Sequence, residues 1–247
     1  MTTISTLASK VVARFHRDGA LAASRYYASV VKHAAHYLAY DRRWDRLEQV
    51  RTSGAILVPE TDVVGRTDRL EDRRYQAAAR LPVTWAIRAL RVDPAQYTFV
   101  DYGSGRGRVL LTAARFPFKK VIGVEFSRTL HRQACENIAG YPKERLDCSE
   151  VVSLNLNAVD FDLPSGDCVL FFLNPFGGET LDRVTDRIER SWLDSPRSIL
   201  VAFANSNRVP LFVHRRLFQR LRPTIPDRLR VNFLSPWPFE FFAVRGR

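Results

Sequence analysis

A glycine-rich segment that follows an acidic residue is the clearest sign of chemistry in this chain. An apolar run leads into Asp101, and Gly103, Gly105 and Gly107 then alternate before a helix is predicted to begin. Glycines let backbone N–H groups approach a ligand, and open α/β sheets bind ligands at the carboxyl ends of their strands. A dinucleotide-binding fingerprint would place its third glycine at the position of Arg108, so the spacing argues against a pyrophosphate cofactor.

A second acidic residue ends the next predicted strand. The apolar run over residues 119–124 leads into Glu125, which lies twenty residues after Gly105. At this distance an acidic side chain commonly holds a ribose, because a carboxylate accepts hydrogen bonds from both ribose hydroxyls. Glu125 is therefore predicted to bind a ribose.

A third segment follows a wholly apolar run over residues 169–173, which is typical of a strand buried on both faces. The run ends in Asn174, Pro175 and Phe176. Asn and Pro are ordinary turn formers after a strand, so this segment taken alone is also compatible with a simple turn.

In this order the three segments resemble class I S-adenosylmethionine-dependent methyltransferases, over residues 97–247. The resemblance implies an α/β fold: a Rossmann-like, mostly parallel seven-stranded sheet with helices on both faces. It implies S-adenosyl-L-methionine as the cofactor. Asp101 and the glycine loop would cradle the methionine part of that cofactor, Glu125 would hold its ribose, and the loop after the fourth strand would face the transferred methyl group.

The cofactor site implied by the resemblance extends beyond these residues. Its members are Asp101, Gly103, Ser104, Gly105, Gly107, Glu125, Phe126 and Asn157. Asn157 stands where the family usually has an aspartate that contacts the adenine amino group, and its side-chain oxygen can accept the same hydrogen bond. A turn asparagine is equally compatible with this position. Tyr75 lies where similar enzymes reach the carboxylate end of the cofactor, but the sequence favours a packing role for it.

The catalytic residues implied by the resemblance are Asn174, Pro175 and Phe176. They look like the Asn-Pro-Pro-aromatic motif of amino-group methyltransferases, with one proline instead of two. They are also similar to the loops of non-SET histone lysine methyltransferases and of bacterial methyltransferases with an Asn-Pro-Phe loop. Methyl transfer mainly requires the acceptor to be held about 3 Å from the activated carbon. The Asn174 oxygen can hold an amine N–H and Phe176 can lie against a base or a cation, which predicts N-methylation of an amine such as a protein lysine.

Other functions stay open from the sequence: methylation of a base amino group in nucleic acid, methylation of a small molecule, and a cofactor-binding interaction module without catalysis. The chain has 38 Lys and Arg against 26 Asp and Glu, a net charge of +12. This excess favours an acidic acceptor or partner, either protein or nucleic acid. A genome rich in arginine codons would explain the charge equally well, because the arginines are scattered.

Composition sets the broad class. Among 247 residues, 46% are hydrophobic, which is enough for a sizeable core. The sequence has no run of 18 apolar residues, so no membrane-spanning helix is predicted. Three cysteines, Cys135, Cys148 and Cys168, are predicted to be buried free thiols in a reducing, cytoplasmic setting. Neither the cysteines nor the five histidines have metal-ligand spacing, so no metal site is predicted.

The chain divides into two predicted regions. Residues 1–80 form a basic helical extension with an irregular segment, and residues 81–247 form the methyltransferase domain. Helices are predicted over residues 4–15 and 20–40, although the acid-free first 17 residues also resemble a transit peptide. The second helix interleaves tyrosines with basic residues, which favours a helical cover that packs its aromatic rings on the domain over a nucleic-acid or membrane face.

Strands and helices alternate in the second region. Strands are predicted over residues 97–102, 119–125, 148–154, 168–173 and 198–205, with a terminal pair inside 228–244. Helices are predicted over 82–91, 106–116 and 181–192. A further helix is predicted to begin after Ser127, and another to begin at Pro210 and to contain Arg215, Arg216, Arg220 and Arg222. This alternation is typical of an α/β domain with a mostly parallel sheet.

Overall fold

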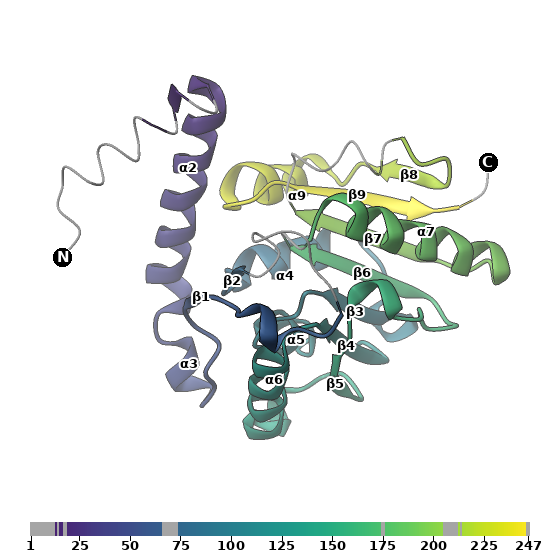
Figure 1. The fold of residues 1–247 in the computed structure, drawn as a ribbon, viewed down its shortest axis with the longest axis horizontal. Helices are drawn as coiled ribbons and strands as arrows, with labels where there is room; N and C mark the ends of the chain where they lie inside the picture. Colours follow the sequence, from purple (N-terminus) through teal and green to yellow (C-terminus); the bar gives the residue numbers. More distant parts are fainter. Residues whose placement is uncertain are drawn as a thin grey trace.

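A seven-stranded sheet forms the centre of the molecule (Figure 1). The computed structural model describes residues 13, 15–16, 19–65, 74–173, 176–204, 212 and 214–245. The strands are β3 (Thr98–Tyr102), β4 (Lys120–Glu125), β5 (Val151–Asn155), β6 (Cys168–Leu173), β7 (Ile199–Ala204), β8 (Phe218–Leu221) and β9 (Phe239–Val244). Their order is β5-β4-β3-β6-β7-β9-β8; β9 runs antiparallel to β7 and β8, and all other neighbouring pairs are parallel. The predicted α/β class and mostly parallel seven-stranded sheet are confirmed.

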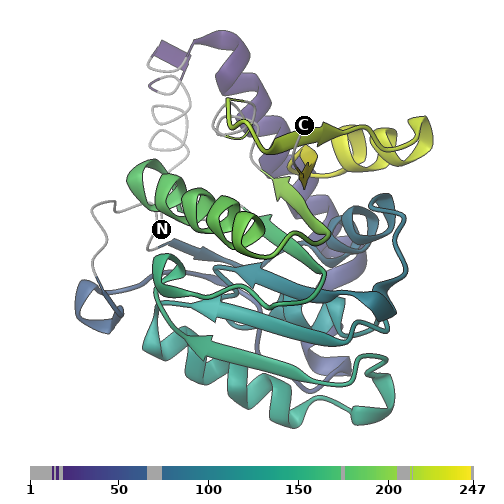
Figure 2. The same cartoon turned by 90° about the vertical axis from the view of Figure 1, so that its right-hand side faces the viewer.

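Helices cover both faces of this sheet, as predicted. On one face lie α4 (Arg80–Ala89), α5 (Arg108–Ala113) and α6 (Arg128–Gly140). Figure 2 shows α7 (Gly178–Asp194) crossing the other face. The Ser127 side chain accepts a hydrogen bond from the Leu130 N–H and so caps α6, as the sequence predicts.

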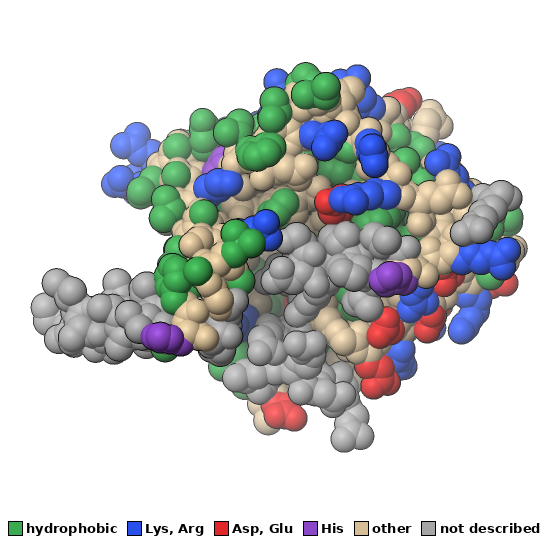
Figure 3. All heavy atoms as spheres, turned by 90° about the horizontal axis from the view of Figure 1, so that it is seen from above, with side chains coloured by type: hydrophobic (Ala, Val, Ile, Leu, Met, Phe, Trp, Pro, Cys, Tyr) green, Lys and Arg blue, Asp and Glu red, His purple; other side chains and the backbone are tan. Residues whose placement is uncertain are grey.

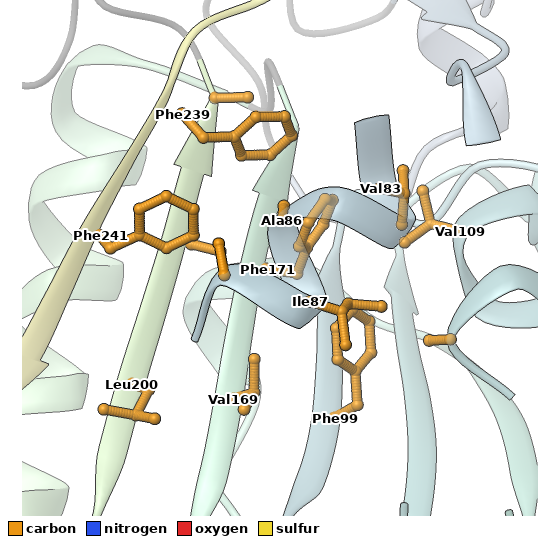
Figure 4. Packing of buried hydrophobic residues seen from close by; sticks show 14 of the residues in the cluster. Val83, Ala86, Ile87, Phe99, Val109, Val169, Phe171, Leu200, Phe239 and Phe241 are labelled. Carbon is orange, nitrogen blue, oxygen red and sulfur yellow. The ribbon is translucent and has the colours of Figure 1, made fainter. Parts of the chain in front are cut away.

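The core consists of two apolar layers that alternate along the strands. In β6, Phe171 packs toward α4 together with Phe239 and Phe241, and Ile87 of α4 completes this layer (Figure 4). The next residue, Phe172, points to the α7 side. Successive side chains of a strand point to opposite faces, so a central strand covered on both sides must be apolar throughout.

The N-terminal region is built from short elements around one long helix. α2 (Ala20–His36) continues into a π-helical turn, Tyr37–Asp41, and α3 (Trp44–Leu47) follows. β1 (Ala55–Leu57) and β2 (Arg74–Gln76) form a separate antiparallel pair. The predicted helix over 20–40 is confirmed, whereas the one over 4–15 lies almost wholly outside the described residues. The domain boundary near residue 80 stays a prediction.

The described residues also form several short helical elements. They are η2 (Glu60–Asp62), η4 (Pro94–Gln96), η5 (Lys143–Arg145), η6 (Ala158–Asp160), α9 (Ile225–Leu229) and η8 (Arg230–Leu234). No helix in the described ranges has the length and apolar character needed to cross a bilayer.

Two predictions about the C-terminal part are wrong. The arginine-rich stretch after Pro210 is not one helix, because Arg220 lies in β8, where Phe218 points into the core and Arg220 pairs with Glu240. The first strand of the terminal pair is therefore β8 and not part of 228–244, where α9 and η8 lie instead. Helical and strand periods are hard to distinguish in so short and basic a segment.

Two further predictions from side-chain type are wrong. Cys135 is exposed on α6, and Cys148 is only half-buried, whereas Cys168 is buried as predicted. The tyrosines of the predicted helix over 20–40 do not all pack on the domain, since the exposed fractions of Tyr37 and Tyr40, in the π-helical turn after α2, are 37% and 56%. Cys135 lies away from the buried side of α6, which is formed by Leu130, Ala134 and Asn137.

Candidate ligand-binding site

One pocket lies where β3, β4 and β6 end at the same edge of the sheet. Because the parallel strands share a direction, their carboxyl ends bring distant sequence segments together. The pocket brings together eight of the predicted site residues: Asp101, Gly103, Ser104, Gly105, Glu125, Phe126, Asn157 and Phe176. Gly107 is not part of its lining, and Asn174 and Pro175 lie outside the described residues.

The glycine loop needs its glycines for backbone conformation. Gly103, Gly105 and Gly107 have φ angles of +84°, +54° and +82°, which only glycine adopts at low cost. The Gly103 N–H donates to the Val124 carbonyl at 2.9 Å and so ties the loop to β4. Gly107 precedes α5 and lies close to Ala134 of α6, so its role is to begin one helix beside another.

Gly105 also lies in direct contact with an aromatic side chain. A Cβ atom built on Gly105 would be 2.3 Å from the Tyr75 ring. The Tyr75 hydroxyl donates to the Thr52 carbonyl at 2.5 Å, and the Arg106 guanidinium lies 5.1 Å from the ring centre. Tyr75 therefore packs on the glycine loop, as the sequence favours, and it also lines the pocket.

Glu125 connects the end of β4 with the glycine loop. Its carboxylate accepts hydrogen bonds from the Gly105 N–H at 2.7 Å and from the Ser127 N–H at 2.9 Å. The side chain is buried, and this burial raises the pKa of Glu125 to about 7 although both backbone hydrogen bonds oppose the shift. A carboxylate has about four lone-pair sites, so Glu125 retains acceptor capacity toward the pocket.

Asp101 is buried with an unused acceptor. Its Oδ2 atom has no hydrogen-bond partner among the described residues, and neither has the hydroxyl of Ser104, another residue of the pocket lining. Burial, reinforced by the nearby negative charge of Glu125, raises the pKa of Asp101 well above its usual range. An unsatisfied buried acceptor costs free energy, so both atoms favour a ligand that brings hydrogen-bond donors or a positive charge into the pocket.

Asn157 uses its side chain for a turn. Its Oδ1 accepts a hydrogen bond from the Val159 N–H at 3.2 Å and begins η6, while its Nδ2 donates to the Val64 carbonyl at 3.5 Å. The structure thus shows the turn alternative, and the adenine contact stays a prediction. Phe176 lines the same pocket with its ring edge-on to Tyr102.

Arg108 is a site residue that sequence reasoning did not identify. Its buried guanidinium donates to Thr52 Oγ1 at 2.7 Å, to Ser53 Oγ at 2.7 Å and to Asp45 Oδ1 at 3.0 Å. These bonds fix residues 45–53 against the start of α5, and Arg108 itself lines the pocket. The only signal in the sequence is an arginine at the place of a third glycine, which does not specify its partners.

The site has the chemistry of an organic-ligand pocket. Within the described ranges, no three or more His, Cys, Asp or Glu side chains are placed to hold a metal ion. Two buried carboxyl groups and a glycine loop face apolar walls that include Val58, Phe126 and Leu156. Acidic groups suit hydroxyls and an ammonium, and apolar walls suit a flat base, so a nucleoside that carries an amino-acid part fits the residues present.

The raised pKa values make stability depend on pH in a specific direction. Glu125 binds protons more tightly in the folded chain, so its contribution is fully present below its unfolded pKa of 4.5 and is lost as the pH rises through about 7. The ligand-free protein should lose stability from pH 5 to 8, by on the order of 3 kcal/mol from this group. Thermal melts of the ligand-free chain and of Glu125→Gln check this. A stability that rises over this range, or an identical slope in Glu125→Gln, would contradict the assignment.

Comparisons with known proteins show similarity at the level of structure only. No family model and no curated protein matches the chain. A protein from Escherichia coli with a provisional methyltransferase name is 14% identical, with a TM-score of 0.48 over 77% of this chain and 92% of its own. A provisional RNA methyltransferase from Pyrococcus horikoshii is 11% identical, with a TM-score of 0.46 over 76% of this chain and 95% of its own.

An RNA methyltransferase from Salinibacter ruber in complex with S-adenosyl-L-homocysteine is also similar. It is 13% identical, with a TM-score of 0.40 over 64% of this chain and 88% of its own. The identities are all below 25%, so the similarity concerns the fold alone.

Proposed function

We propose that this protein is an S-adenosylmethionine-dependent methyltransferase. The observation that carries the proposal is one pocket in which the glycine loop, Asp101 and Glu125 meet Phe176. The first three would bind a cofactor and the last lies next to the loop that would face its methyl group. Fold alone would not support this function, because the same architecture hosts many activities.

Different residues of the pocket would bind different parts of the cofactor. Gly103 and Gly105 let the backbone approach the cofactor, and the free oxygen of Asp101 would accept from its ammonium group. Glu125 would accept from the ribose hydroxyls while it continues to hold the Gly105 N–H. The bound cofactor would supply a methyl group already activated on a sulfonium, so no group of the chain has to activate it.

The acceptor is proposed to be an amine, such as a protein lysine. Asn174 would hold its N–H through the side-chain oxygen, and Phe176 would lie against a cationic amine. An ammonium must lose its proton before it can attack, and water would take that proton. The chain then needs only to orient the lone pair toward the methyl carbon.

A base amino group in nucleic acid is the second candidate acceptor. The net charge of +12 favours it, because Lys and Arg bind phosphates in a salt-dependent way. Loss of oligonucleotide binding between low and physiological salt, together with methyl transfer to that oligonucleotide, would select this acceptor class.

All three cysteines are free, which agrees with a proposed cytoplasmic setting.

Asn174→Ala tests the proposed division between binding and turnover. We expect cofactor affinity to stay within about twofold and methyl transfer to fall by about 100-fold, because the lost group would position only the acceptor. Radiolabelled methyl transfer to protein, RNA, DNA and small-molecule fractions measures turnover, and calorimetry measures affinity. Equal losses in both would place Asn174 in the cofactor pocket or the core instead.

A further inference from the structure

An exposed apolar row runs along α9 and η8. Ile225, Leu229 and Phe233 follow one another at four-residue spacing, and their exposed fractions are 72%, 50% and 66%. Asp227 and Val231, between them, are buried against the domain. An amphipathic helix normally turns its apolar face toward the core, so exposed apolar side chains on its outer face indicate a binding surface.

α2 and the π-helical turn that follows it also expose apolar side chains. Val30 and Val31 of α2 and Leu38 of the turn have exposed fractions of 46%, 67% and 63%. α2 adjoins η8, since the His36 ring nitrogen Nε2 lies 2.9 Å from the Leu234 carbonyl oxygen. We call the exposed apolar residues of these adjoining elements the α2–α9 surface.

The exposed charge of this surface is positive. Arg25 of α2 and Arg228 of α9 are exposed, and so are Arg42 and Arg43, which follow the π-helical turn after α2. The acidic residue of α9 is already engaged, since Asp227 pairs with Arg91 and Arg230. The acidic residues that follow α2 are engaged as well: Asp41 with Arg80, Asp45 with Arg108, and Glu48 with Arg115 and Arg145. In Figure 3, which looks down on the side of the molecule where α9 lies, hydrophobic and basic side chains intermingle over part of the face, and acidic ones gather mostly elsewhere.

We propose that the α2–α9 surface docks on an anionic lipid membrane. Exposed aliphatic and aromatic side chains flanked by arginines match the boundary between acyl chains and negative headgroups. A nucleic acid would be bound by the arginines but would leave Ile225 and Leu229 without a role, because it offers phosphates and stacking bases. A second copy of this chain would bring like charges together.

Docking would bring the membrane close to the candidate site. Trp237 lines the pocket, and its ring lies 5.0 Å from the His33 ring of α2. One wall of the pocket is therefore continuous with the proposed docking surface. The proposal stands on the surface alone and does not depend on the reaction assigned to the pocket.

Vesicle sedimentation tests the docking. The full chain is mixed with vesicles of phosphatidylcholine alone or of phosphatidylcholine with phosphatidylglycerol, at low and high salt. We expect binding to the anionic vesicles only, weakened by salt. The variant Leu229→Ser/Phe233→Ser should bind at least about tenfold more weakly, because it removes two apolar side chains that would enter the membrane. A matched variant, Leu57→Ser/Leu193→Ser, changes side chains with exposed fractions of 51% and 62% elsewhere and should bind normally.

Several outcomes would overturn the proposal. Absence of vesicle binding, equal binding to neutral vesicles, or equal loss in both variants would do so. Loss of oligonucleotide binding in Leu229→Ser/Phe233→Ser, without vesicle binding by the parent chain, would assign the surface to nucleic acid. A dimer of the parent chain in solution that this variant disperses would assign it to self-association. Circular dichroism of both variants verifies that they fold.

Discussion

Gly105→Ala is expected to abolish detectable binding of S-adenosylmethionine. The backbone φ at this position is +54°, where a side chain costs about 1 to 2 kcal/mol. The added methyl group would also lie 2.3 Å from the Tyr75 ring, so the ring or the loop must move. Movement of the loop displaces the Gly105 N–H from Glu125, and movement of the Tyr75 ring alters the lining of the pocket. Calorimetric titration of the variant measures the effect.

Two further variants separate the causes. Gly166→Ala adds a methyl group where no atom lies within 4 Å, so cofactor affinity should be unchanged. In Tyr75→Ala/Gly105→Ala the clash is removed while the unfavourable φ remains, so binding should be partly restored. Normal affinity in Gly105→Ala itself would show that the loop does not contact the ligand.

Glu125→Ala is expected to weaken cofactor binding by about 10- to 100-fold or more. A hydrogen bond to a charged group contributes about 1.5 to 3 kcal/mol, and this carboxylate would accept from the ribose. The substitution also leaves the N–H groups of Gly105 and Ser127 without their acceptor, so the loop itself loses a fixed position. Affinity is measured by calorimetry, and the melting temperature shows how much of the change is structural.

Matched variants make this result specific. Glu125→Gln keeps the size and one acceptor oxygen, so an intermediate affinity is expected. Glu150→Ala removes a carboxylate that pairs with Lys120 outside the pocket, so affinity should not change. An affinity in Glu125→Ala equal to that of the parent chain would remove the ribose assignment.

The strands of the sheet were predictable because their burial leaves a strong pattern. β6 reads as a continuous apolar run because Phe171 and Phe172 must enter opposite core layers. Asp101 and Glu125 were predictable as pocket residues because acids that end apolar runs lie at the carboxyl edge of a parallel sheet. Local residue order carries all of this information.

Other features depend on contacts between distant segments. Arg108 binds residues 45–53 through Asp45, Thr52 and Ser53, and nothing near Arg108 in the sequence names these partners. Glu125 bonds to the Gly105 N–H in addition to its predicted role, a contact that exists only once β3 and β4 pair. β8 escaped prediction because a four-residue edge strand with one fully buried side chain, Phe218, has too short a pattern.

The identity of the ligand is the central claim, and one titration tests it most directly. The ligand-free full chain is titrated calorimetrically with S-adenosylmethionine and, separately, with NAD. The proposed pocket predicts micromolar binding of S-adenosylmethionine and no binding of NAD, because the glycine spacing does not suit a pyrophosphate. No binding of S-adenosylmethionine, or preferential binding of NAD, would contradict the proposed function.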